Sequence, residues 1–131
     1  MSEPLRVVGA AILESARVLC AQKDGTGPLA GLWEFPGGKV EPEESPRAAL
    51  RREVLEELSC EIDVGDLLTT TSHAYEFATI SLSVYLCSLR GGRPIPVEHQ
   101  RLRWVAAEDL DSLDWAPADR EAVRKLGTLL A

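Results

Sequence analysis

The apolar positions along the chain predict several strands in its first two thirds. Residues 5–13 and 16–22 are apolar runs that meet near Glu14 and Ser15, which is typical of a β-hairpin, and residues 32–35 add a brief strand. Residues 77–89 alternate with a period of two, so we expect a half-buried strand there, and residues 102–105 continue the sheet. One side of the alternating strand holds Ile80, Leu82, Val84 and Leu86, and the other holds Thr79, Ser81, Ser83 and Tyr85.

A spacing of three and four residues predicts a helix over residues 47–58. Ser45 is a suitable N-cap for this helix, and Pro46 suits its first turn. Ser59 stands where such a helix usually ends on a left-handed glycine, so we expect a frayed or differently capped end. The apolar back of the helix is expected to hold Ala48, Val54, Leu55 and Leu58, and the opposite side to hold Glu53, Glu56 and Glu57.

The C-terminal residues 116–130 predict a second helix, which packs through Val123, Leu126 and Leu130. The chain has 131 residues, of which 45% are hydrophobic, and this suits one domain over residues 1–131 with one core. The mixture of strands and helices predicts an α/β fold. Loops near residues 23–31 and 90–100 are rich in Gly and Pro, and we expect them to form the rims of a pocket.

Charge and cysteine content narrow the classes of function. A net charge of −7 argues against an extended surface for duplex nucleic acid. No apolar run approaches the length of a membrane span, so we expect no membrane partner and a cytoplasmic location. The cysteines, Cys20, Cys60 and Cys87, are odd in number and widely spaced, which favours buried free thiols in a reducing compartment.

The acidic residues gather in one segment. Residues 41–61 contain seven carboxylates and three arginines, a local charge of −4 that is costly unless cations bind. If residues 47–58 are helical, Glu53, Glu56 and Glu57 share one face, because offsets of three and four residues do so. Carboxylate oxygens suit hard divalent ions, so this segment predicts a site for Mg²⁺ or Mn²⁺.

The same segment resembles the Nudix box. Gly38, Glu44, Arg52, Glu53, Val54, Glu56 and Glu57 match the spacing of that motif, whereas Ser59 and Cys60 depart from its glycine and larger aliphatic residue. The flanking segments, Trp33-Glu34-Phe35-Pro36-Gly37-Gly38-Lys39 and Trp115-Ala116-Pro117-Ala118-Asp119, resemble the branch of MutT and CTP pyrophosphohydrolases. The resemblance implies a Nudix-type α/β/α sandwich with a mixed sheet between helices.

The resemblance also implies roles at the metal site. It assigns Glu53, Glu56, Glu57 and the carbonyl of Gly37 as metal ligands, with Glu44 supporting them. Arg52 either orients Glu53 or is an exposed arginine that offsets negative charge. Glu98 lies where MutT-like enzymes carry a glutamate close to the metals, so it is a candidate ligand or general base, and Glu53 is the competing base.

Substrate contacts are expected from residues on either side of this segment. Lys23 and Lys39 are placed to meet phosphates, although each is equally an ordinary surface lysine. Asp119 resembles the position at which MutT reads its base, and an ionised carboxylate there suits the exocyclic amine of cytosine. Asp119 is alternatively an early-turn residue of the last helix. Trp33, Phe35 and Tyr75 are candidates for stacking or for the core. His73 and His99 have no metal-ligand spacing.

These features predict a metal-dependent pyrophosphohydrolase, acting as a monomer or homodimer on small nucleotides. It would convert a nucleoside triphosphate of the dCTP or CTP type, or an oxidised nucleotide, to the monophosphate and pyrophosphate. The alternatives are an enzyme specific for 8-oxo-dGTP, a hydrolase of ADP-ribose or of a dinucleoside polyphosphate, and a non-catalytic nucleotide-binding module.

Overall fold

The computed structural model of the chain describes residues 3–130. The strands are β1 (Leu5–Glu14), β2 (Arg17–Lys23), β3 (Trp33–Glu34), β4 (Gly37–Lys39), β5 (Glu61–Ala74), β6 (Thr79–Gly91) and β7 (His99–Ala106). The α-helices are α1 (Pro46–Leu58) and α2 (Arg120–Leu130), and two short 3₁₀ helices, η1 (Ala107–Ser112) and η2 (Pro117–Asp119), precede α2.

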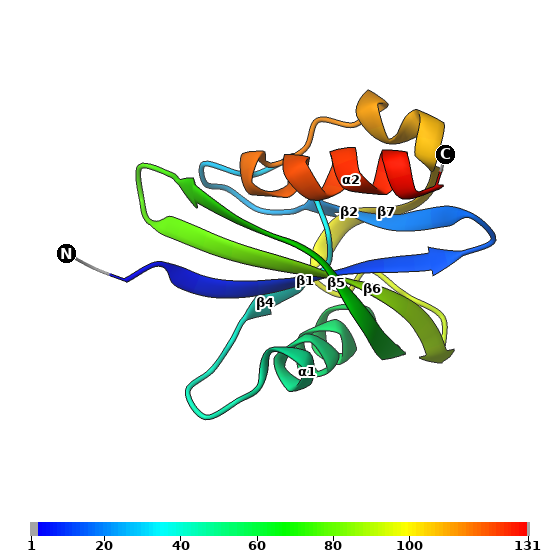
Figure 1. Cartoon of the computed structure of the whole chain (residues 1–131), viewed down its shortest axis with the longest axis horizontal. Helices are drawn as coiled ribbons and strands as arrows, with labels where there is room; N and C mark the ends of the chain where they lie inside the picture. Colours follow the sequence, from blue (N-terminus) through cyan, green and yellow to red (C-terminus); the bar gives the residue numbers. More distant parts are fainter. Residues whose placement is uncertain (1–2, 131) are drawn as a thin grey trace.

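The sheet is mixed and is organised around β1. Strand β1 runs parallel to β6, from Leu5 opposite Ile80 to Ile12 opposite Cys87, and antiparallel to β4 on its other edge. The strand order is β3-β2-β1-β6-β5, and β7 pairs with the outer length of β2. Helices α1 and α2 cover opposite faces of this sheet (Figure 1), which confirms the predicted α/β/α sandwich.

Each face of the sheet has its own apolar core. The core beneath α2 includes Trp33, Val84 and Leu126, and the core beneath α1 includes Leu50 and Tyr85. The prediction that β6 is half-buried is therefore wrong. Tyr85 points away from Val84 yet is only 8% exposed, because α1 covers the second face of the strand.

The N-terminus of α1 is capped as predicted, since the Ser45 hydroxyl accepts a hydrogen bond from the Ala48 N–H at 3.1 Å. The predicted apolar back was wrong at one position. Leu55 is 51% exposed, because the buried stripe follows Leu50, Val54 and Leu58 at intervals of four residues. Only the residues on or beside this stripe pack against the sheet.

The C-terminus of α1 differs from the expected frayed end. Ser59 adopts the left-handed conformation, with φ of 54° and ψ of 35°, and its N–H donates to the Leu55 carbonyl at 3.0 Å. The serine thus makes the cap that glycine usually makes, at a backbone cost of about 1 kcal/mol.

The turn at Ser15 and Ala16 confirms the predicted hairpin between β1 and β2. Both residues have positive φ, 52° and 61°, as a type I′ turn requires. Two strands were not predicted: β4 has three residues, two of them glycine, and β5 is long but rich in threonine, serine and aspartate. Pairing with β1 and β6, rather than local pattern, forms both.

The last predicted helix begins later than expected. Residues 117–119 form η2, and α2 starts at Arg120, with Val123 and Leu126 buried and Leu130 partly buried in the predicted packing stripe. Among residues 3–130, no helix combines the length and the apolar composition that a membrane crossing needs.

Candidate active site

A cleft of about 450 Å³ lies between β1, β4, α1, the β5–β6 turn and the segment 116–119. We refer to this space as the cleft. Eight of the residues predicted to bind substrate or metal line it: Lys23, Gly37, Lys39, Glu53, Glu57, Tyr75, Glu98 and Asp119. Lys23, Leu29 and Glu98 come from the two loops that were predicted to form pocket rims.

The two glycines of β4 allow two different close approaches. A Cβ at Gly37 would overlap the Val8 carbonyl of β1, and a Cβ at Gly38 would occupy the position of the Glu53 carboxylate. Neither glycine has positive φ, so close approach, and not backbone conformation, explains both residues. Gly38 therefore leaves room for the Glu53 carboxylate in the cleft.

Glu53 and Glu57 present two carboxylates to the cleft from successive turns of α1. Glu57 accepts a hydrogen bond from the Gly37 N–H at 3.1 Å. Burial raises the pKa of Glu57 to about 7, and the nearby charges of Glu34 and Glu53 add to the effect. Burial likewise raises the pKa of Glu53, assisted by Glu56 and Glu98. Negative charges are crowded here, so a cation would stabilise the ionised forms.

The donor set fits a hard divalent ion in its chemistry. Glu53, Glu57 and Glu98 line one cleft and offer oxygen ligands of the kind that Mg²⁺ and Mn²⁺ prefer. Within residues 3–130, however, no three acidic, histidine or cysteine side chains converge closely enough to form a ready metal site. The carboxylates share a cleft without meeting at one point, so binding of an ion requires side-chain movement.

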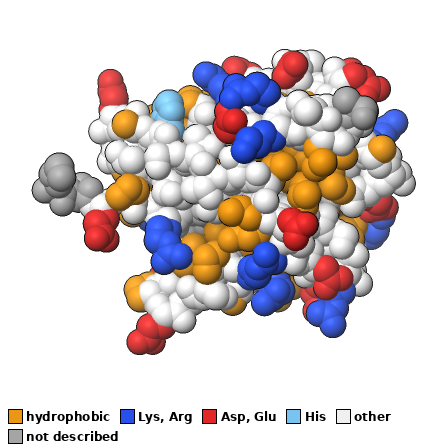
Figure 2. Space-filling view, in the orientation of Figure 1, with side chains coloured by type: hydrophobic (Ala, Val, Ile, Leu, Met, Phe, Trp, Pro, Cys, Tyr) orange, Lys and Arg blue, Asp and Glu red, His pale blue; other side chains and the backbone are white. Residues whose placement is uncertain are grey.

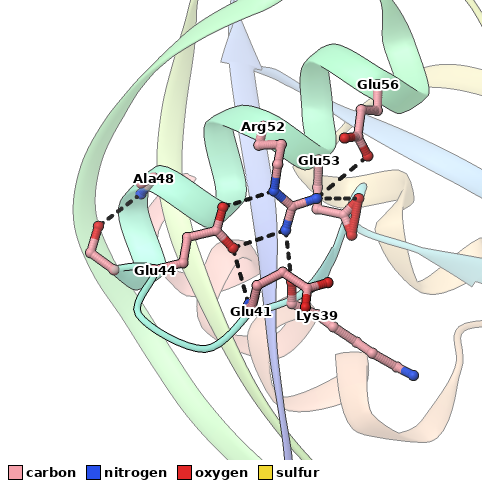
Figure 3. A network of polar contacts seen from close by, with 8 residues as sticks. Lys39, Glu41, Glu44, Ala48, Arg52, Glu53 and Glu56 are labelled. Carbon is pink, nitrogen blue, oxygen red and sulfur yellow. Dashed lines mark hydrogen bonds and ion pairs between the residues drawn. The ribbon is translucent and has the colours of Figure 1, made fainter.

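Arg52 organises the segment that precedes α1 (Figure 3). Its guanidinium donates to both carboxylate oxygens of Glu44, at 2.8 and 2.9 Å, and to the Lys39 carbonyl at 3.1 Å. The same group lies 3.4 Å from the carboxylates of Glu53 and Glu56. The hydrogen bonds from Arg52 lower the pKa of Glu44 to about 2. Arg52 therefore contacts Glu53, as one of the two predicted alternatives requires.

Two of the residues predicted to bind substrate or metal lie outside the cleft, as do the supporting residues Glu44 and Arg52. Glu56 is exposed on α1 and pairs with Arg52, at the edge of the carboxylate cluster (Figure 3). Trp33 is 6% exposed in the core beneath α2, where its N–H donates to the Asp114 carbonyl. The structure thus favours the core alternative for Trp33, and the correction has a simple reason: Trp33 and Glu34 alternate along β3, and only Glu34 reaches the cleft.

Asp119 lines the cleft from η2, on the side of the sheet that α2 covers, whereas Arg52 belongs to α1 on the opposite side (Figure 1). Its Oδ2 accepts a hydrogen bond from the Phe35 N–H at 3.0 Å, and the residue is 6% exposed. Burial raises the pKa of Asp119 to about 8, and the charge of Glu34 adds to the effect. Burial thus favours the neutral acid, which also offers an O–H donor, over the ionised carboxylate expected from the sequence.

His99 was not assigned a role from the sequence, but it contacts Glu34 in the lining of the cleft. Its Nε2 lies 2.9 Å from Glu34 Oε2, and its side chain is 4% exposed. Burial lowers the pKa of the imidazole, but the hydrogen bond and charge of Glu34 and the charge of Glu57 outweigh this, so the pKa is raised. Its Nδ1 is buried without a hydrogen-bond partner among the described residues. His99 and Glu34 are 65 positions apart, so no local pattern indicated this pair.

Fold and cleft together define an α/β/α sandwich protein with an acidic, oxygen-donor site. A model of the NUDIX domain matches residues 7–125. The chain is 39% identical over 115 residues to the CTP pyrophosphohydrolase of Escherichia coli, covering 88% of this chain and 85% of that protein. It is 34% identical over 93 residues to the 8-oxo-dGTP diphosphatase of Haemophilus influenzae, covering 71% and 68%.

Solved structures agree with the sequence matches. The solution structure of the Nudix hydrolase MutT from methicillin-resistant Staphylococcus aureus is 43% identical and superposes with a TM-score of 0.81, over 98% of this chain and 99% of that one. The chain belongs to the Nudix hydrolase family. The family resemblance inferred from residues 38–57 is thereby confirmed.

Proposed function

We propose that this Nudix hydrolase converts a nucleoside triphosphate and water to the nucleoside monophosphate and pyrophosphate. One observation carries the proposal: a single cleft is lined by the carboxylates of Glu53, Glu57 and Glu98 and, from a different element, by the buried Asp119. A nucleotide presents the matching arrangement, with a polyphosphate at one end and a hydrogen-bonding base at the other. The names of the relatives, a CTP pyrophosphohydrolase and an 8-oxo-dGTP diphosphatase, support the same substrate class.

At the polyphosphate end, we propose that Glu53, Glu56, Glu57, Glu98 and the Gly37 carbonyl hold Mg²⁺ or Mn²⁺. The ion, when bound, would neutralise phosphate charge and stabilise the departing pyrophosphate. The assignment of Glu53, Glu57 and Glu98 is supported by their shared position in the cleft. Glu56 is assigned through the family motif, and its exposed carboxylate would have to turn from Arg52 toward the ion.

The chain supplies the other functions of the reaction directly. Glu98 or Glu53 accepts the proton of the attacking water, and both line the cleft, so either carboxylate is within the same space as the substrate. Lys23 and Lys39 bind phosphate oxygens. Arg52, through its bidentate pair with Glu44, orients Glu53 and holds the segment after β4.

At the base end, Asp119 is the proposed reader. When ionised, its Oδ1 accepts a hydrogen bond from an exocyclic amine such as N4 of cytosine, while Oδ2 remains bound to the Phe35 N–H. An amine donor would lower the raised pKa of Asp119 and so couple binding to release of a proton. We therefore propose dCTP or CTP as substrates, with 8-oxo-dGTP as the second candidate because of the H. influenzae relative.

The face in Figure 2 shows basic, acidic and apolar side chains interspersed, which suits a small-molecule substrate better than a nucleic-acid duplex.

The three cysteines are buried free thiols, and burial raises the pKa of Cys20 and of Cys87 to about 12. Unreactive thiols are compatible with the reducing environment of the cytoplasm, where we propose that the enzyme acts as a monomer or homodimer.

The proposal is tested with purified protein, Mg²⁺ and a panel of dCTP, CTP, 8-oxo-dGTP, dUTP, ADP-ribose and diadenosine tetraphosphate. Products are separated by ion-exchange chromatography. The proposal requires pyrophosphate and the monophosphate in equal amounts from at least one triphosphate, and loss of this activity with EDTA. Release of AMP and ribose phosphate from ADP-ribose as the dominant reaction would contradict it, and tight binding without metal-stimulated turnover would indicate a non-catalytic module.

A further inference from the structure

Phe77 is an exposed aromatic residue at the rim of the cleft. It lies in the turn between β5 and β6, where the Tyr75 N–H donates to the Ala78 carbonyl at 2.9 Å and closes the turn. This turn, at the green hairpin tip in Figure 1, and the loop that carries Leu29 both line the cleft. Phe77 is 53% exposed although exposure of so large an apolar ring is unfavourable. Core packing therefore does not account for this residue.

The neighbouring Tyr75 is already enclosed by aromatic rings. Phe77 stacks on it with ring centroids 5.0 Å apart and an interplanar angle of 11°, and the His73 ring lies 4.4 Å away, tilted by 58°. Both rings therefore contact the Tyr75 ring, which is itself half-buried. The Tyr75 hydroxyl accepts a hydrogen bond from the Ala118 N–H at 2.8 Å. Tyr75 is thus held in place, and its ring is less accessible to a base than that of Phe77.

The Phe77 ring is more accessible than the Tyr75 ring. Tyr75 covers one face of its ring, and more than half of the residue remains accessible at the cleft. The same Tyr75 is tied to Ala118, which precedes the proposed base reader Asp119. Tyr75 therefore holds the exposed Phe77 ring in place and links it to the part of the cleft that contains Asp119. A ring that is already fixed in position loses less conformational entropy when a base stacks on it.

We propose that Phe77, and not Tyr75, is the stacking platform for the nucleobase, and that it determines how strongly base size affects substrate choice. The proposal rests on the function proposed above, because it concerns the base end of the same cleft. Stacking energy grows with the overlap of the two ring systems, so a purine gains more from Phe77 than a pyrimidine does. Asp119 then selects by hydrogen bonding, and Phe77 selects by ring area.

The test compares Phe77→Ala, Phe77→Leu and wild type with 8-oxo-dGTP, dGTP and dCTP. Phe77→Ala should raise KM by roughly fivefold to thirtyfold, with the larger increase for the purines, and should leave kcat almost unchanged. Phe77→Leu keeps apolar area but removes the aromatic face, so it should recover only part of the loss. Leu129→Ala is the matched control, since Leu129 is 54% exposed on α2 and lies outside the cleft lining.

A binding measurement makes the test independent of turnover. Phe77→Trp places a fluorescent ring at the platform, and its emission should change on addition of dGMP or dCMP but not of ribose 5-phosphate, which has no base. Equal KM values in Phe77→Ala and Leu129→Ala, or an equal response of Phe77→Trp to ribose 5-phosphate, would overturn the proposal. A wild-type protein that releases no pyrophosphate would instead contradict the proposed function, and the fluorescence result would still decide about Phe77.

Discussion

The two ends of the cleft are built from different parts of the chain. The carboxylate end takes Gly37, Glu53 and Glu57 from one continuous stretch, and Glu98 joins them from a distant loop. The base end depends on a hydrogen bond between Phe35 and Asp119, which are 84 residues apart. A motif of fixed spacing therefore positions the carboxylates, whereas the long-range fold positions Asp119.

The electrostatics of the two ends differ in the same way. At the carboxylate end, burial and neighbouring negative charges together raise the pKa of Glu53 and of Glu57. At the base end, burial is the main cause that raises the pKa of Asp119 to about 8, with a smaller contribution from Glu34. In the proposed function, a cation completes the first end, and a ligand that donates or accepts one hydrogen bond completes the second. The following experiments separate these two descriptions.

The largest expected effect is at the carboxylate end. Glu53→Gln removes a charge and a proton acceptor while keeping the shape of the side chain, so kcat should fall by about 100-fold to 10,000-fold. Steady-state kinetics with dCTP and Mg²⁺ measure this change, and circular dichroism checks that the fold is retained. Glu61→Gln is the control, because Glu61 is exposed on β5 and should keep wild-type kcat. Equal activity of both variants would remove Glu53 from the proposed mechanism.

Arg52 and Glu44 should show an intermediate and shared effect. Arg52→Lys cannot reproduce the bidentate pair with Glu44, so Glu53 loses its fixed neighbour and kcat should fall by about 10-fold to 100-fold. Glu44→Gln should have a similar effect. Because both variants break one pair, the double variant should lose little more than either single one. If instead the losses multiply, the two residues act separately, and the orienting role of Arg52 is wrong.

The base end predicts opposite pH responses for two pyrimidines. Ionised Asp119 accepts from the amine of cytosine, so kcat/KM for dCTP should rise by up to about tenfold per pH unit until the pKa near 8 and then level off. The neutral acid donates to the carbonyl of uracil, so kcat/KM for dUTP should be level below pH 8 and fall above it. The ratio of the two values is measured from pH 6 to 9, because effects of pH on the shared triphosphate and metal site cancel in it.

Asp119→Asn is the control for this ratio. The amide keeps an oxygen for the Phe35 N–H and does not titrate, so the ratio should become independent of pH. A ratio that changes with pH equally in wild type and in Asp119→Asn would show that another group titrates, and Asp119 would lose its proposed role as base reader.

The contrast between local motif and long-range packing also explains how much of the fold could be predicted from the sequence. The hairpin, α1 and the carboxylates follow from local periodicity and from a motif whose residues lie close in sequence. Tyr85 and Leu55 were misjudged because burial depends on what packs against each face, and a strand pattern does not reveal that α1 covers β6. The strands β4 and β5 were missed because pairing with β1 and β6 forms them in spite of their polar sequences.

At the site, charged residues were easier to predict than their protonation and neighbours. Asp119 was predicted from its position, but its raised pKa follows from burial that only the folded chain shows. The contact between His99 and Glu34 joins residues 65 positions apart, so spacing could not indicate it. Phe77 was not predicted, because a single aromatic residue in a turn follows no periodic pattern. Its proposed role depends on the contacts of Tyr75 with neighbouring rings, which only the folded chain shows.

The smallest expected effect concerns the helix that carries the carboxylates. Ser59→Gly relieves the left-handed backbone at the end of α1, so it should raise the free energy of unfolding by about 1 kcal/mol and Tm by about 3 °C. Ser59→Ala keeps a Cβ and should not be stabilised, which separates backbone strain from loss of the hydroxyl. Since α1 has the same conformation in both variants, kcat should stay at the wild-type value. A Ser59→Gly variant that is more stable but has a reduced kcat would mean that the position of the carboxylates depends on strain at Ser59. The spacing of the motif would then not be sufficient to position them.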